Sequence, residues 1–103
     1  MQDSERARYF DRQGKPMGLM EWGEAFKDNR VALDEIDGVR ISTVWLGLNH
    51  RFGPGAPLIF ESMVFGGSMD EEQRRYSTEA EAIAGHAALV AEVKAALAGG
   101  SDV

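Results

Sequence analysis

The chain has 103 residues and a mass of 11.3 kDa, the size of one domain. Its hydrophobic content of 44% suits a globular core, and the absence of cysteine excludes disulfides, thiolate metal sites and a cysteine nucleophile. A net charge of −6 disfavours nucleic acid as a partner, and no apolar run long enough to cross a membrane stands out. We expect one domain over 1–103, frayed at 1–8 and 99–103, that stays in the cytoplasm.

The first half of the chain predicts a short hairpin, a short helix and a longer hairpin. Residues 9–17 place an apolar pair and Pro-Met on either side of a polar turn, which is typical of a short hairpin or of a strand followed by a turn. From Leu19 to about Asn29 the large apolar residues recur at helical spacing. The runs 31–36 and 39–48 flank Asp37-Gly38, a strong two-residue hairpin signal, and predict two antiparallel strands.

The second half predicts a loop, a third strand and a long helix. Residues 49–57 are rich in glycine and proline and indicate a loop, whereas 58–65 has the composition of a strand. A charged connection follows over 68–76, and Ser77-Thr78 caps a helix that runs to about Ala98. The predicted fold is α+β: an antiparallel meander of three to four strands with a short N-terminal helix and a longer C-terminal helix packed on it.

Strand alternation predicts a sheet that is apolar on both faces. If the strands 39–48 and 58–65 pair about the loop, facing residue numbers sum to about 106, and Trp45 lies opposite Glu61. One face, expected to be core, then holds Val44, Leu46, Leu48, Leu58, Phe60 and Val64, with Ser42 and Ser62 among them. The opposite face holds Ile41, Thr43, Trp45, Ile59, Glu61, Met63 and Phe65.

Two interpretations of the second apolar face remain open. In one, the C-terminal helix covers the first face while Leu19, Trp22 and Phe26 shield the second. In the other, the second face is a docking patch, because apolar surfaces with few charges mark protein interfaces. We take the patch as the candidate protein-binding site, formed by Trp45, Ile59, Met63 and Phe65 with help from His50 and Arg51 in the loop.

The two histidines offer the only candidates for acid–base chemistry. His86 lies on the apolar stripe of the last helix, where a core histidine with one hydrogen bond is the simpler expectation. A functional alternative pairs it with Glu61, although the face assignment puts the helix on the other side of the sheet. His50 sits at the mouth of the 49–57 loop as a binding residue or an exposed turn residue. We predict no catalytic residue, no metal site and no cofactor.

Three segments resemble a group of small uncharacterised proteins carried by bacteriophages and actinobacterial genomes. They are WLGLNH (45–50), PLIFESMVFGG (57–67) and RYSTEAEAIAGH (75–86), and the likeness covers about residues 30–97. The resemblance implies the same aromatic-rich hairpin and helix start, and it brings no activity, cofactor or catalytic residue. It implies an accessory or host-interacting role in the bacterial cytoplasm.

The expected function is therefore that of a non-enzymatic protein-binding module of phage type, which inhibits a host or bacterial-defence protein. An alternative is a self-associating structural or virion-associated protein, in which the partner is a second copy in a homodimer. A third possibility is a small enzyme that uses His50, Glu61 or His86. The sequence leaves the partner and the oligomeric state open.

Overall fold

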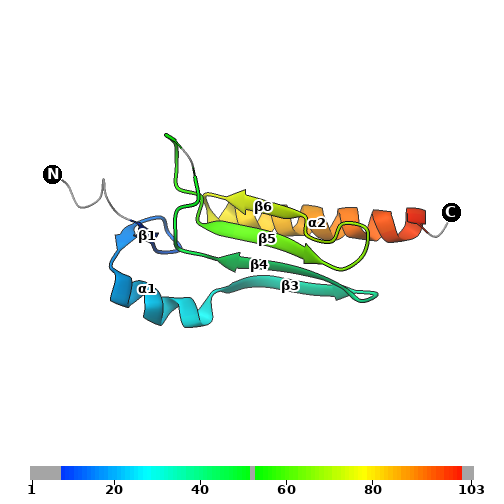
Figure 1. Cartoon of the computed structure of the whole chain (residues 1–103), viewed down its shortest axis with the longest axis horizontal. Helices are drawn as coiled ribbons and strands as arrows, with labels where there is room; N and C mark the ends of the chain where they lie inside the picture. The colour runs from blue at the N-terminus through cyan, green and yellow to red at the C-terminus, as the bar shows by residue number, and fades with distance from the viewer. Residues whose placement is uncertain (1–7, 52, 101–103) are drawn as a thin grey trace.

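A computed structural model describes residues 8–51 and 53–100, and it shows an α+β fold (Figure 1). The elements in chain order are β1 (Tyr9–Phe10), β2 (Pro16–Met17), α1 (Leu19–Ala25), the 3₁₀ helix η2 (Phe26–Asp28), β3 (Arg30–Ile36), β4 (Val39–Trp45), β5 (Phe60–Phe65), β6 (Gln73–Tyr76) and α2 (Glu79–Gly100). The predicted fold class is confirmed, including both hairpins and both helices.

The main sheet is an antiparallel meander in the order β3-β4-β5-β6. Asp37 and Gly38 join β3 to β4 with positive φ values of 48° and 83°, as a type I′ turn requires. This turn twists in the same sense as its flanking strands, which is why Asp-Gly predicted the hairpin correctly.

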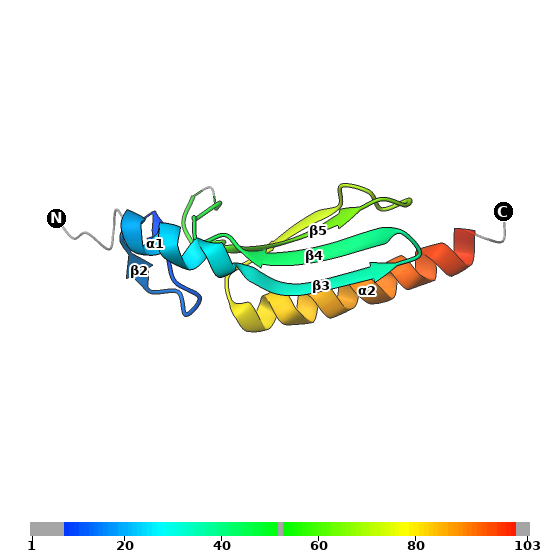
Figure 2. The same cartoon turned by 90° about the horizontal axis from the view of Figure 1, so that it is seen from below.

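Helix α2 runs along one face of the sheet and leaves the other face bare (Figure 2). Its first turn carries the predicted capping box: Thr78 Oγ1 accepts from the Glu81 amide at 3.1 Å, and Glu81 Oε1 accepts from the Thr78 amide at 3.2 Å. The buried residues of α2 face the sheet and are Ala82, His86, Leu89 and Val93. They pack over the alternate residues of β4 and β5, which are Val39, Ile41, Thr43, Trp45, Phe60, Ser62 and Val64.

Residues Glu79–Gly99 of α2 are long and apolar enough to span a membrane by length and composition, which the sequence analysis did not anticipate. The helix instead forms one layer of the folded domain. Its inner side supplies the core residues, and Glu92 on its flank forms an ion pair with Arg74 of β6 at 2.8 Å. Only 22% of the apolar window in this stretch is buried, and the buried residues are those that face the sheet.

The N-terminal elements close one end of the core. The rings of Trp22 and Phe26 lie 4.9 Å apart, and Phe26 lies 6.1 Å from Trp45. The Trp45 indole donates to the Phe10 carbonyl at 3.0 Å, which ties the β1-β2 hairpin to the sheet. Trp22 and Phe26 therefore pack beside Trp45, as expected, but on the same side of the sheet as α2, so the expectation that the two helices cover opposite faces is wrong. Leu19 itself is 59% exposed.

The register of β4 against β5 differs by one residue from the prediction. Trp45 faces Phe60 and Thr43 faces Ser62, so facing numbers sum to 105. The cause is an irregularity at the end of β4, where the Ile59 carbonyl accepts from both the Leu46 and the Gly47 amides, at 2.7 and 3.2 Å. Gly47 has a φ of +73° that accommodates the extra residue.

Because of this shift, the predicted face assignment is wrong for β4. The side chains of Ile41, Thr43 and Trp45 lie under α2 together with Phe60 and Val64, whereas Ser42 and Val44 lie on the bare face.

Several predicted boundaries also change. The third strand begins at Phe60 instead of 58, and the expected charged connection contains β6. Fraying was also expected at residues 8, 99 and 100, and the structure differs there. Helix α2 continues through Gly100, and the Arg8 carbonyl accepts from the Asn49 amide at 3.3 Å. The expected fraying at 1–7 and 101–103 lies outside the described residues.

Candidate functional site

The bare side of the sheet, here called the open face, is a grid of three rows set by the strand register. The first row contains Glu35, Arg40 and Phe65; the middle row contains Leu33, Ser42, Met63 and Gln73; the third row contains Arg30, Val44, Glu61 and Arg75. The middle row has no charge, and each outer row carries both signs. The open face therefore has an apolar and neutral centre between two mixed-charge borders.

The apolar side chains of the open face are more accessible than those of a core. Leu33 is 45% exposed and Phe65 is 44% exposed, and Val44 and Met63 are half-buried. Cross-strand ion pairs border them: Arg40 Nε lies 3.8 Å from Glu35, and Arg75 Nε lies 3.1 Å from Glu61. Such paired charges around a small apolar centre are typical of the rim of a protein interface.

The candidate binding residues divide between the two sides of the sheet. Met63 and Phe65 lie on the open face, as expected. Trp45 and Ile59 are each 1% exposed within the core. The prediction that Trp45 and Ile59 line an open patch is therefore wrong, because the register shift turns the indole under the helix layer. Sequence reasoning missed Leu33 and Val44, which a correct register would have placed beside Met63.

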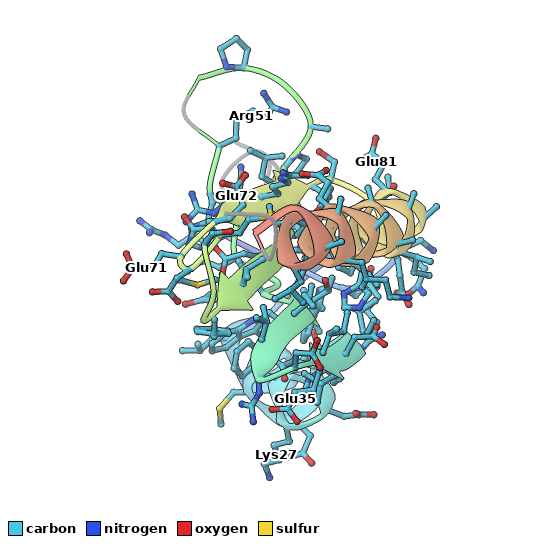
Figure 3. All side chains as sticks on the ribbon, turned by 90° about the vertical axis from the view of Figure 1, so that its right-hand side faces the viewer. Lys27, Glu35, Arg51, Glu71, Glu72 and Glu81 are labelled. Atoms are coloured by element: carbon cyan, nitrogen blue, oxygen red, sulfur yellow. The ribbon has the colours of Figure 1, made fainter. Side chains whose placement is uncertain are left out.

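The loop with His50 and Arg51 is well held but lies away from Leu33 and its neighbours. Asn49 Oδ1 accepts from the amides of Arg51 and Leu58 at 2.9 and 3.0 Å, and Arg51 Nε donates to the Ala56 carbonyl at 2.6 Å. Figure 3 shows Arg51 on a projecting loop at one end of the view, with Glu35 near the other end. His50 and Arg51 therefore stand apart from the β3 side of the open face.

A hollow of about 380 Å³ lies between the β1-β2 turn and α1. Arg12 is its only cation among the lining residues, which are Asp11, Arg12, Gln13, Glu24, Ala25, Asp28 and Trp45. The Arg12 guanidinium already bonds Glu79 at 3.2 Å and the carbonyls of Asp28 and Arg30 at 3.0 Å. Arg12 thus connects the N-terminal hairpin to α2 and to the start of β3, and the hollow is not a built anion site.

A chain of polar side chains crosses the core between the sheet and α2. His86 Nε2 lies 2.7 Å from Asp34 Oδ2, and His86 Nδ1 lies 2.7 Å from Thr43 Oγ1. Thr43 in turn hydrogen-bonds Ser62, whose oxygen accepts from the Tyr76 hydroxyl at 3.1 Å. Each of the four strands of the main sheet, and α2, contributes one side chain to this polar chain. The core-histidine expectation for His86 holds, with two partners instead of one.

The polar chain has one consistent direction when His86 is neutral. Tyr76 donates to Ser62, Ser62 to Thr43, Thr43 to Nδ1, and the Nε2 proton goes to Asp34, so every donor has one acceptor. Although Asp, His and a hydroxyl are the components of a nucleophilic triad, Thr43 and Ser62 are fully buried and offer no access to a substrate. The arrangement satisfies buried polar groups.

The structure does not bring together the three residues of the enzyme alternative. His86 lies beneath the sheet, Glu61 is paired with Arg75 on the open face, and His50 lies at the base of the projecting loop. Within residues 8–51 and 53–100, no group of three or more His, Asp or Glu side chains could hold a metal ion. No protein-family model, curated protein or solved structure matches this chain.

The ion pair between β6 and α2 makes a testable contribution to acid stability. Hydrogen bonds from Arg74, at 2.8 and 2.9 Å, hold the pKa of Glu92 below its ordinary value. A carboxylate whose pKa is lower in the folded state stabilises the fold above its unfolded pKa of about 4.3 and loses this effect as the pH falls through the folded pKa.

We therefore expect Glu92→Gln to lower the melting temperature at pH 6, and only slightly because the pair is exposed and screened. At pH 2.5 the effect is expected to be smaller, because acid favours the protonated form of Glu92. Thermal melts followed by circular dichroism over that pH range measure the difference. Glu71→Gln is the control, because it makes the same charge change at an exposed carboxylate that does not bond Arg74 and lies outside the capping box. A penalty for Glu92→Gln that is the same at both pH values would contradict the assignment.

Proposed function

We propose that this protein is a small non-enzymatic protein-binding module whose contact surface is the open face. The supporting observation is the bare sheet side with exposed Leu33 and Phe65 beside half-buried Val44 and Met63. The solvent side of an antiparallel sheet is normally polar, since only one side must cover a core. An apolar centre with paired charges around it matches the core and rim of a protein interface.

The partner surface has a matching chemistry: a small apolar area bordered by charges of both signs. The resemblance of the chain to phage and actinobacterial proteins favours a bacterial cytoplasmic setting, in which inhibition of a host or defence protein is one role. The buried position of Trp45 moves the proposed contact from the indole to Leu33, Met63 and Phe65.

A photo-crosslinking residue at position 65 tests this proposal in the bacterial cytoplasm. We expect one crosslinked species of defined mass, reduced at least about tenfold by Leu33→Lys, because a buried lysine at an apolar centre costs more than about 1.4 kcal/mol. Ile83→Lys is the matched control, since Ile83 is 54% exposed on α2 and outside the open face. No adduct, or an adduct insensitive to Leu33→Lys, would overturn the proposal.

A further inference from the structure

We infer that the partner of the open face is a second copy of this chain, packed sheet to sheet about a two-fold axis that runs across the strands along the middle row. This inference rests on the proposed function and names its partner. Among residues 8–51 and 53–100, Figures 2 and 3 show no layer on the side of the sheet away from α2, so a second sheet can approach it directly.

The charge distribution allows two copies to meet at their open faces although each chain carries a net charge of −6. The open face carries Arg30, Arg40 and Arg75 against Glu35 and Glu61, a net charge of +1, while the whole chain carries −6. The remaining surface therefore holds the entire negative excess. Two copies that meet at their open faces keep this excess on the outside, where their like charges are farthest apart and best screened.

The order of the rows makes the face complementary to itself. A two-fold axis along the middle row lays the first row of one copy over the third row of the other and keeps each strand over its own copy. Glu35 then faces Arg30 of the partner subunit. Phe65 then faces Glu61 of the partner subunit, whose ion-pair partner, Arg75 of the partner subunit, lies one strand away and within reach of the aromatic ring.

The middle row meets its own copy under the same operation. Leu33 packs on the partner subunit's Leu33, and Met63 packs on the partner subunit's Met63, so the apolar centre is buried from both sides. An axis along the strands instead places Arg30 over Arg75 of the partner subunit, which sets two cations against each other. The charge pattern thus selects one of the two face-to-face arrangements.

The size of the grid predicts a weak dimer. Three rows on four strands cover about 20 Å by 20 Å, or about 400 Å² per copy, from the usual strand spacings. This is about half of a standard interface, so a dissociation constant on the order of tens of micromolar is expected.

Sedimentation velocity on the full chain tests the inference through a pair of charge reversals. The wild type is expected to pass from monomer to dimer between about 1 μM and 1 mM. Glu35→Arg and Arg30→Glu each place two like-charge contacts in their own homodimer, and each should weaken self-association at least about tenfold. An equimolar mixture of the two variants restores both opposite-charge contacts and is expected to form a heterodimer at wild-type affinity.

Ile83→Lys is the control for a charge change elsewhere, and thermal melts establish that both reversals leave the monomer folded. A wild type that stays monomeric at about 1 mM would overturn the second-copy inference. If the position-65 crosslink to another protein then remains sensitive to Leu33→Lys, the proposed function survives. A dimer insensitive to Leu33→Lys overturns the second-copy inference, and the position-65 crosslink then decides the proposed function separately. A mixture that fails to associate, with a wild type that dimerises, overturns the two-fold arrangement and with it the inference.

Discussion

Trp45→Ala is expected to destabilise the domain by about 3–5 kcal/mol, the cost of truncating a large buried aromatic side chain. The indole is 1% exposed, contacts the Phe26 ring, and donates to the Phe10 carbonyl at 3.0 Å. Its removal opens a cavity at the junction of the sheet and the N-terminal elements and leaves a backbone carbonyl without its donor. Urea denaturation followed by circular dichroism gives the free energy of unfolding.

The adjacent residue provides a matched control. Val44→Ala removes apolar atoms from the open face, so we expect a loss of about 1 kcal/mol or less. The contrast between Trp45 and Val44 tests which side of β4 is inward. If Val44→Ala cost as much as Trp45→Ala, the α2 layer would have to cover the side assigned here to the open face.

Thr43→Val is expected to cost about 2–4 kcal/mol although it preserves the side-chain shape. The Thr43 hydroxyl donates to His86 Nδ1 and accepts from Ser62, so its removal leaves His86 Nδ1 without a donor and the Ser62 hydroxyl proton without an acceptor. Each unsatisfied buried group costs about 1–3 kcal/mol. The measurement is again the free energy of unfolding in urea.

Thr43→Ser and Ser42→Val are the controls for this polar chain. Thr43→Ser keeps the hydroxyl and loses one methyl group, so about 1 kcal/mol is expected. Ser42→Val makes an equally apolar change one residue away, on the open face, and should leave the stability nearly unchanged. A Thr43→Val variant as stable as Thr43→Ser would show that the hydroxyl is not needed between His86 and Ser62.

The β3-β4 turn and the start of α2 could be predicted from the sequence, because a few neighbouring residues determine each of them. Asp37-Gly38 satisfies a type I′ turn by itself, and Thr78 with Glu81 satisfies the first amides of α2 by themselves. The pairing of β4 with β5 depends on the long segment 46–59 between them. There the Ile59 carbonyl accepts two amides, and nothing in the pattern of apolar residues shows which residue is extra.

The residues predicted for the candidate site depended on the predicted register of β4 against β5. A one-residue shift exchanged the two sides of β4, so Trp45 moved into the core and Val44 moved out of it. Leu33 lies on β3, whereas the predicted faces comprise only residues of 39–48 and 58–65. Asp34 was missed as a partner of His86 because the two lie far apart in the sequence and meet only after β3 pairs at the sheet edge. These three errors concern the pairing of strands and side chains that are far apart in the sequence, which local sequence patterns do not reveal.

The polar chain restricts where the length of this protein can change. Each strand must place one side chain of this hydrogen-bonded chain on the α2 side of the sheet. These side chains are Asp34, Thr43, Ser62 and Tyr76. An insertion or deletion of one residue inside any strand rotates its side chain to the opposite side and breaks the polar chain at that point. Changes in length are therefore confined to the segments between strands, such as the projecting loop over residues 49–57.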